Sequence, residues 1–156
     1  ILIDRFIKSL NISKEDGLLL VGHGGLGSGN SSYGNLQFKI IRDGLTNVRI
    51  AVLENAPYVA DVAMPWEWLD GKRPNTIYVH PLLLVLGDHA QNDLFGDEED
   101  SVINELTDYG YAVKPIYSAL GEYEAIQDIF RQHVQDCIDD LYGKRSPHRP
   151  TIPNIK

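Results

Sequence analysis

The chain has 156 residues, of which 43% are hydrophobic and 23% are charged, and its formal net charge is −8. This composition is typical of one globular domain with its own core, and the negative charge argues against nucleic acid as a partner because phosphate contacts need basic side chains. No apolar run reaches the roughly 18–20 residues of a membrane span, and a single cysteine, Cys137, excludes an internal disulfide.

Apolar spacing predicts an ordered series of helices and strands along the chain. After a helical segment over residues 1–10, strands are predicted at 18–21, 47–53, 76–86 and 112–118, and helices at 30–43, 57–66, 101–109 and 122–142. Pro65 should kink or divide the second of these helices, and Pro81 implies an edge position, a bulge or a break in the third strand. Residues 87–100 are predicted to be a long polar loop.

Alternating strands and helices predict an α/β fold, a doubly wound and mainly parallel four-stranded sheet with helices on both faces. We expect a linking helix over 1–16, the α/β domain over 17–143 and an irregular tail over 144–156. The last helix should bury a stripe of residues that step by three and four. That stripe comprises Ile126, Ile129, Phe130, Val134, Cys137, Ile138 and Leu141, so that Cys137 is expected to be a structural thiol.

Three predicted strand ends carry the chemistry that must be explained. The first strand runs into a glycine loop that contains His23, the second ends at Glu54, and the third runs into Gly87-Asp88-His89. In open α/β sheets, ligands bind outside the carboxyl ends of the strands. Two imidazoles and one carboxylate suit either a divalent transition metal with open coordination positions or general acid–base catalysis.

The remaining candidates favour structural interpretations. Gly22–Gly29 matches part of a dinucleotide fingerprint but lacks the Lys-Ser/Thr of a phosphate loop. His80 is expected to pack inside its strand, and His133 to lie on the surface of the last helix. His148 has no assigned role, Asp97–Asp100 reads as a solvated run, and Trp66 and Trp68 either pack a helix onto the sheet or line a cleft.

Several segments resemble the anaerobic cobalt chelatases, the sirohydrochlorin cobaltochelatases that are class II chelatases related to ferrochelatase. They are Val21-Gly22-His23-Gly24, Glu54 with Ala56-Pro57, Pro81-Leu-Leu-Leu-Val-Leu-Gly-Asp-His89-Ala-Gln-Asn-Asp93, Gly96-Asp-Glu-Glu-Asp-Ser101, and Leu120-Gly121-Glu122 with Ala125-Ile126. The resemblance covers about 17–142, and the Gly-Asp-His-Ala-x-Asn-Asp segment is its most specific part.

The resemblance implies ATP-independent insertion of a divalent metal into sirohydrochlorin or a related tetrapyrrole in cobalamin biosynthesis. It places His23 and His89 as catalytic residues and His23, Glu54 and His89 as metal ligands. Gly24, Gly25, Asp88 and Asn92 then become candidate substrate contacts. Co²⁺ is the expected substrate metal, with Ni²⁺ and Fe²⁺ as alternatives, and no organic cofactor is expected.

The chain departs from the family pattern at several positions. Asn55-Ala56 stands where the family has Gly-Tyr, Leu83 and Leu94 replace methionines, and Val102 replaces a frequent tryptophan. The chain also resembles only the C-terminal half of the long family members. A second α/β half or a homodimer partner is therefore expected to complete the cleft.

Two other functions remain open at this level. One is a haem- or tetrapyrrole-binding or transport protein on the same fold, with a histidine as axial ligand. The other is a flavodoxin-like binding or signalling domain without metal. The expected location is cytoplasmic, or periplasmic if a signal peptide was lost, because the sequence begins at Ile1.

Overall fold

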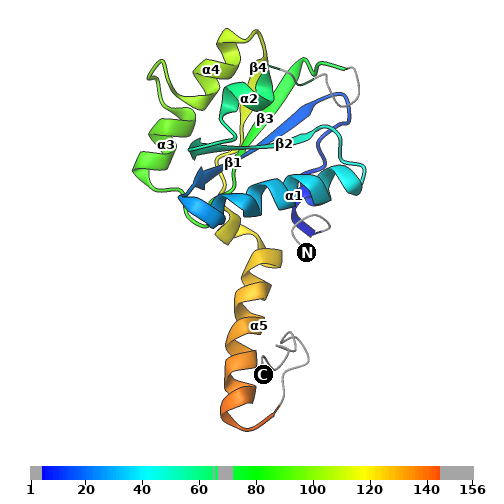
Figure 1. The fold of residues 1–156 in the computed structure, drawn as a ribbon, viewed down its shortest axis with the longest axis vertical. Coiled ribbons are helices and arrows are strands. Elements are labelled where there is room, and N and C mark those ends of the chain that lie inside the picture. Colours follow the sequence, from blue (N-terminus) through cyan, green and yellow to red (C-terminus); the bar gives the residue numbers. More distant parts are fainter. Residues whose placement is uncertain (1–4, 65, 67–71, 145–156) are drawn as a thin grey trace.

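The computed structural model describes residues 5–64, 66 and 72–144, with the backbone alone at Ser28 and His89 (Figure 1). The elements in chain order are η2 Ile7–Leu10, β1 Gly17–Gly24, η3 Gly27–Asn30, α1 Ser31–Arg42, β2 Val48–Glu54, α2 Val59–Ala63, β3 Thr76–Pro81, α3 Asp88–Phe95, α4 Val102–Asp108, β4 Ala112–Pro115, η5 Leu120–Glu122 and α5 Glu124–Leu141.

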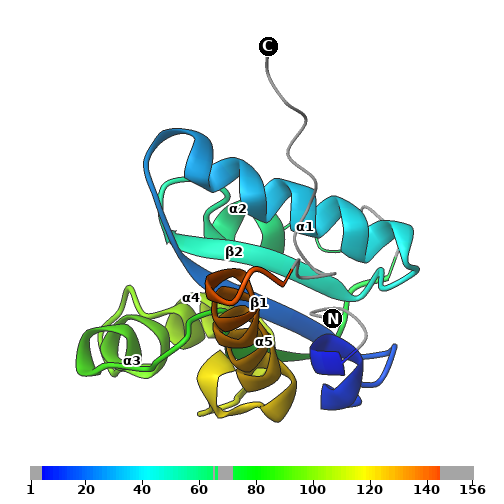
Figure 2. The same ribbon diagram turned by 90° about the horizontal axis from the view of Figure 1, so that it is seen from below.

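The four strands form one parallel sheet in the order β2-β1-β3-β4. The strand β1 therefore lies between β2 and β3, and its Leu20 pairs with Ile50 on one side and His80 on the other. Helices cover both faces of this sheet (Figures 1 and 2). The predicted doubly wound α/β fold is confirmed.

Each face of the sheet buries its own apolar cluster. Alternate residues of β1 point to opposite faces, so Leu19 and Val21 join one cluster while Leu18 and Leu20 join the other. The first cluster is completed by α2, α3 and α4, and the second by the N-terminal segment, α1, η5 and the start of α5. Both faces of β1 are thus buried in apolar packing, as expected for a central parallel strand.

The segment before β1 packs into the second cluster. Phe6 and Ile7 are buried. The ring of Phe6 contacts the rings of His80 and Tyr123 edge-on, with distances between ring centroids of 4.9 and 4.8 Å. The predicted helix over 1–10 is represented in the described residues mainly by the short 3-10 turn Ile7–Leu10, and residues 1–4 lie outside them. The predicted boundary between a linking helix over 1–16 and the α/β domain over 17–143 stays a prediction.

Trp66 is held over the sheet by a buried arginine. The Arg49 guanidinium donates to the backbone oxygen of Trp66 at 3.0 Å, and its carbon lies 5.2 Å from the centre of the Trp66 ring. Both side chains are buried. The packing interpretation of Trp66 is therefore confirmed, whereas Trp68 lies outside the described residues.

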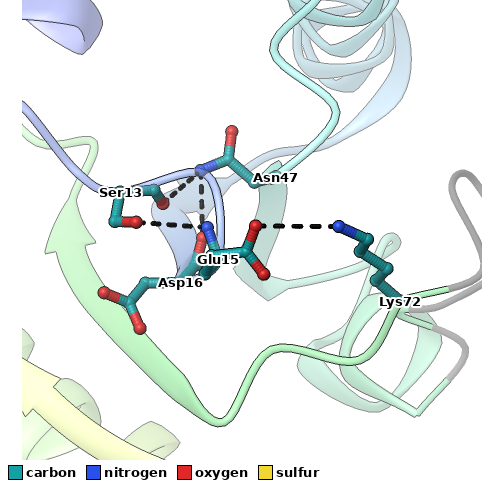
Figure 3. Close-up of polar contacts among 5 residues, drawn as sticks. All are labelled: Ser13, Glu15, Asp16, Asn47 and Lys72. Carbon is teal, nitrogen blue, oxygen red and sulfur yellow. Dashed lines mark hydrogen bonds and ion pairs between the residues drawn. The ribbon is translucent and has the colours of Figure 1, made fainter.

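Polar contacts join the loops at the amino end of the sheet (Figure 3). The Asn47 side-chain amide donates to the backbone oxygens of Ser13 at 3.0 Å and Asp16 at 2.9 Å. The Lys72 ammonium lies 3.6 Å from a carboxylate oxygen of Glu15. The basic side chains Lys14, Lys72 and Arg73 line a hollow at this end, far from the candidate strand ends.

Two predicted boundaries around the third strand are wrong. The strand β3 ends at Pro81 and not at residue 86, because proline has no N–H to extend the ladder, so the break was the correct alternative. Residues 88–95, predicted to be part of a polar loop, form the helix α3. Among the described side chains of that helix, only Leu94 is buried in the core, which explains why its apolar period is too weak to detect.

The predicted burial of the last helix is also wrong for this chain. Ile126 is buried and Ile129 is partly buried, but Phe130, Val134, Ile138 and Leu141 are exposed, as is Cys137. Beyond its first turns, α5 leaves the α/β body, and Figure 2 views it nearly end-on. Periodicity predicted the apolar stripe correctly but not what covers it. No described helix is long and apolar enough to cross a membrane.

The buried His80 is structural, as predicted. Its Nδ1 lies 2.7 Å from the carbonyl oxygen of Pro81, which can only accept, so Nδ1 carries the proton and Nε2 accepts from the Tyr123 hydroxyl at 2.9 Å. Burial lowers the pKa of His80 below its ordinary 6.5, although the Pro81 bond and the charge of Glu122 act in the opposite direction. The folded chain therefore favours the neutral imidazole.

This lowered pKa predicts a stability loss in mild acid. Between the folded pKa and 6.5, the unfolded chain binds more protons at His80 than the folded chain, so the free energy of unfolding falls as pH falls, by at most about 1.4 kcal/mol per pH unit. Urea unfolding of the wild type and of His80→Gln from pH 7.5 to 5 should show a steeper loss in the wild type. Parallel curves would contradict a neutral His80, because the carboxylates are common to both proteins.

Candidate functional site

His23 and Glu54 lie side by side at the carboxyl edge of the sheet. His23 is the penultimate residue of β1, and Glu54 is the last residue of β2. The His23 Nδ1 atom lies 3.9 Å from Glu54 Oε2, and each side chain is 63% exposed. A contact between two side chains this exposed contributes little to stability, so both groups are available to a ligand.

Glycine at position 24 allows the two strand ends to approach. Gly24 pairs with Glu54 in the parallel register and has φ +89°, in the left-handed region that side chains disfavour. A Cβ built on Gly24 would lie 1.9 Å from the backbone oxygen of Glu54. The contact between these backbones therefore sets the separation of the His23 and Glu54 side chains.

Two asparagine amides connect the loops that follow β1 and β2. The Asn30 amide donates to the backbone oxygen of Ala56 at 2.6 Å, and the Asn55 amide donates to that of Gly25 at 3.1 Å. Asn55 has φ 67°, which asparagine tolerates better than most residues. This conformation explains why asparagine can replace the glycine that the resembled family has after the glutamate.

Tyr33 supports the same loop from α1. Its hydroxyl accepts a hydrogen bond from the Gly24 N–H at 3.3 Å. The supporting roles of Tyr33, Asn30 and Asn55 were missed at the level of sequence. Asn30 makes no side-chain cap bond, and its amide instead reaches the second loop.

The third predicted ligand does not lie at a strand end. His89 is the second residue of α3, which follows Gly87 after the irregular segment 82–87, and its side chain lies outside the described residues. No group of three metal-ligating side chains comes together among the side chains that the structure describes. The structure therefore juxtaposes His23 and Glu54, and the contribution of His89 stays a prediction.

The predicted substrate contacts lie on two elements. Gly24 and Gly25 lie at the end of β1, and no atom lies within 4 Å of a Cβ built on Gly25. Asp88 and Asn92 are exposed one helical turn apart on α3. Residues at this spacing share a helix face, so Asp88 and Asn92 can present one polar surface.

Three of the positions at which the chain departs from the family pattern lie in the apolar core next to α3. Leu94 and Val102 are buried, and Leu83 packs against the same apolar cluster. Substitutions at these three positions therefore alter packing beneath the site more than its exposed surface.

Asp97–Asp100 are exposed before α4, as predicted for a solvated run. His133 is exposed on α5, as predicted, and His148 lies outside the described residues.

The pair of His23 and Glu54 has the chemistry of an open metal site. Imidazole nitrogen and carboxylate oxygen are both ligands of divalent transition metals. With metal–ligand bonds of about 2.1 Å and tetrahedral angles, two ligand atoms lie about 3.4 Å apart. The observed 3.9 Å needs only a small closing movement of two exposed side chains to reach that spacing.

Comparisons with known proteins place the chain among metal chelatases. The family model described as cobalt chelatase (CbiK) matches residues 1–139. The sirohydrochlorin cobaltochelatase of Salmonella typhimurium is 26% identical over 129 residues, which are 83% of this chain and 47% of that protein. The chain thus spans about half the length of this curated relative.

A solved structure has the same fold. It is described as a cobalamin (vitamin B12) biosynthesis CbiX protein from Marinobacter aquaeolei VT8, and it matches with a TM-score of 0.61 at 16% identity. The match covers 81% of this chain and 98% of that protein. At this identity, the match supports the α/β architecture alone.

The close approach at Gly24 can be tested with two alanine variants, Gly24→Ala and Gly25→Ala. Gly24→Ala should lower the free energy of unfolding by at least about 2 kcal/mol, because it combines a left-handed φ with a clash against the Glu54 backbone. It should also weaken Co²⁺ binding, since the two candidate ligands, His23 and Glu54, are forced apart. Gly25→Ala meets no atom within 4 Å and is the control. Equal urea midpoints for the two variants would refute this account of the strand ends.

Proposed function

The chain belongs to the cobalt chelatase (CbiK) family, and from this premise we propose that it forms the metal-binding wall of an enzyme that inserts Co²⁺ into a tetrapyrrole. The observation that carries the proposal is the pairing of His23 and Glu54, 3.9 Å apart and exposed, at the edge where α/β sheets bind ligands. Sirohydrochlorin is the proposed substrate, because it is named in the relative's activity.

Each residue has a distinct role in this proposal. Glu54 and His23 hold the incoming metal, and their exposure allows it to leave for the macrocycle. His89, in the first turn of α3, is the proposed third ligand. Metal insertion releases the pyrrole N–H protons, and the imidazole of His23 or His89 is a suitable acceptor once the metal has left it for the macrocycle. Gly24, Gly25, Asp88 and Asn92 are the proposed contacts to the substrate.

Insertion can be tested with single histidine variants. His23→Ala and His89→Ala should each lower the rate of Co²⁺ insertion into sirohydrochlorin by at least about 100-fold, as expected when a ligand or base is lost. Insertion is followed by the absorbance change of the macrocycle. His133→Ala, exposed on α5, should retain the wild-type rate. A His89→Ala enzyme with full activity would remove His89 from the mechanism.

A haem- or tetrapyrrole-binding protein on the same fold is the second candidate. His23 could serve such a protein as an axial ligand, because its imidazole is exposed. Tight haem binding without Co²⁺ insertion by the intact protein would favour this candidate. The alternatives Ni²⁺ and Fe²⁺, and the cytoplasmic location, stay predictions.

We further propose that a second α/β unit completes the cleft, either as another half of a longer polypeptide or as a second copy. The exposed stripe Phe130, Val134, Ile138 and Leu141 on α5 supports this proposal, since a contiguous apolar face on a projecting helix usually marks a protein interface. The chain also spans only 47% of the curated relative. This helix carries five acidic side chains and one basic side chain, a charge that disfavours self-pairing along α5.

The α5 stripe predicts the effect of a charge at its centre. Val134→Asp should cost at least about 2 kcal/mol of the free energy that holds the second unit, because it removes an apolar contact and adds a carboxylate. Sedimentation of the intact protein would show a dimer becoming a monomer, whereas a fused half would show a lower melting temperature at constant mass. Phe38→Asp, on the exposed face of α1, is the control. A Val134→Asp protein with wild-type mass and stability would argue against docking on α5.

A further inference from the structure

The start of α1 carries two side chains that reach the two strand ends of the candidate site. Asn30, the residue before the helix, has helical backbone angles, and Tyr33 follows three positions later, a spacing that places both on one side of a helix. The Tyr33 hydroxyl contacts the end of β1 that carries His23, and the Asn30 amide contacts the loop that follows Glu54. One helical turn therefore contacts both segments that present the proposed metal ligands.

Tyr33 contacts the backbone on either side of His23. Its hydroxyl oxygen accepts a hydrogen bond from the Gly24 N–H at 3.3 Å. A Cβ built on Gly22 would lie 2.8 Å from the same oxygen, so the end of the tyrosine ring lies directly over the backbone of Gly22. His23 lies between these two glycines in β1. Tyr33 thus holds the backbone of His23 from both sides and leaves the imidazole exposed.

Asn30 holds the segment that follows Glu54. Its amide donates to the backbone oxygen of Ala56, two residues after Glu54, at 2.6 Å. The same loop is joined back to β2, because the Val52 N–H donates to the backbone oxygen of Pro57 at 2.9 Å. Ala56 is therefore held between Asn30 and this turn, which limits the movement of the backbone next to Glu54.

The helix that carries these two side chains is itself fixed to the sheet. The Gln37 amide donates to the backbone oxygen of Val48 at 3.0 Å and accepts the Ile50 N–H at 2.8 Å. Because β2 is an edge strand, these bonds satisfy backbone groups that face away from β1. Ile40 is buried in the second apolar cluster, and Tyr33 packs against that cluster. The helix α1 is therefore a rigid support for both strand ends.

The spacing of the proposed ligands depends on such support. His23 and Glu54 are 3.9 Å apart, and each side chain is 63% exposed, so their own contact is too weak to fix their separation. A pair that is already held near its metal-binding geometry binds more tightly, because less ordering is needed when the metal arrives. The backbone contacts from α1 can therefore determine metal affinity.

We propose that Tyr33 and Asn30 are positioning residues that fix the separation of His23 and Glu54 and thereby set the affinity of this pair for a divalent metal. The inference rests on the proposed metal-binding role of the pair and deepens it. Neither side chain touches the metal, and each acts through the backbone of one ligand-bearing segment.

The Co²⁺ affinity of single variants of the intact protein tests the proposal. Tyr33→Phe keeps the ring but removes the acceptor of the Gly24 N–H, and Asn30→Ala removes the bond to Ala56. Each should raise the Kd for Co²⁺ by about tenfold, the lower end of the loss that follows removal of a supporting partner from a metal site. The Kd is measured by calorimetry, with His23→Ala as the blank for Co²⁺ bound elsewhere.

Matched controls and a double variant sharpen this test. Tyr142→Phe, exposed after α5, and Asn35→Ala, exposed on α1, should bind Co²⁺ as the wild type does. The double variant of Tyr33→Phe and Asn30→Ala should weaken binding by less than the product of the single effects, because one mobile ligand already relaxes the spacing. A full product would show that the two side chains act independently and would overturn their shared role.

Stability and hydrogen exchange separate positioning from a merely structural role. Variants with lower urea midpoints but wild-type Kd for Co²⁺ would show that Tyr33 and Asn30 only stabilise the fold, which overturns the proposal. In the metal-free protein, the Gly24 N–H should exchange about fivefold faster in Tyr33→Phe, the effect of losing one hydrogen bond of average strength. An unchanged exchange rate would show that the hydroxyl does not hold this strand end.

Kinetics distinguish this proposal from the proposed activity. The two variants should raise the KM for Co²⁺ and leave the KM for the tetrapyrrole unchanged. Wild-type Co²⁺ affinity in both variants, with insertion intact, would overturn the positioning roles and leave the chelatase activity standing. Weakened Co²⁺ binding by the variants of a protein that inserts no metal would instead support the positioning roles and overturn the activity.

Discussion

The candidate site depends on the backbone contact between Gly24 and Glu54. Parallel pairing of β1 and β2 brings these residues together, and the left-handed φ of Gly24 removes the Cβ that would strike the Glu54 oxygen. Amides of Asn30 and Asn55 then tie the two following loops to each other. His23 and Glu54 are consequently placed by backbone hydrogen bonds and van der Waals contact, while their own side chains stay open to a ligand.

Charge is distributed unequally between the two ends of the sheet. Lys14, Lys72 and Arg73 line the amino end, whereas the segments after the strands are acidic and contain no basic residue. An acidic edge favours a divalent cation and opposes a ligand with many carboxylates. The proposed metal and the proposed tetrapyrrole therefore make opposite demands on one surface, and the proposed second α/β unit would supply the basic side chains that this edge lacks.

Sequence reasoning predicted the fold and two of the three strand ends because these depend on local signals. The apolar runs and glycine punctuation are sufficient for β1 and β2, including the placement of His23 and Glu54. The same reasoning failed at α3, because Leu94 is the one core residue among the side chains described in this short helix, and its apolar period is too weak to detect. At α5 it failed for a different reason. The apolar stripe is present as predicted, but whether another element covers a stripe depends on tertiary or quaternary contacts that periodicity does not report. The hydrogen bonds from Asn30 to Ala56 and from Asn55 to Gly25 were missed, because they join residues that are 26 and 30 positions apart in the sequence.

The central claim is that the edge formed by β1, β2 and α3 holds the metal before it enters the macrocycle. The most direct test is a crystal structure of the intact protein soaked with Co²⁺, with the ion located by its anomalous scattering. The account predicts a cobalt ion bonded to a ring nitrogen of His23 and a carboxylate oxygen of Glu54 at about 2.0–2.2 Å, with His89 completing the set. Cobalt bound elsewhere, or bound without His23 and Glu54, would contradict it.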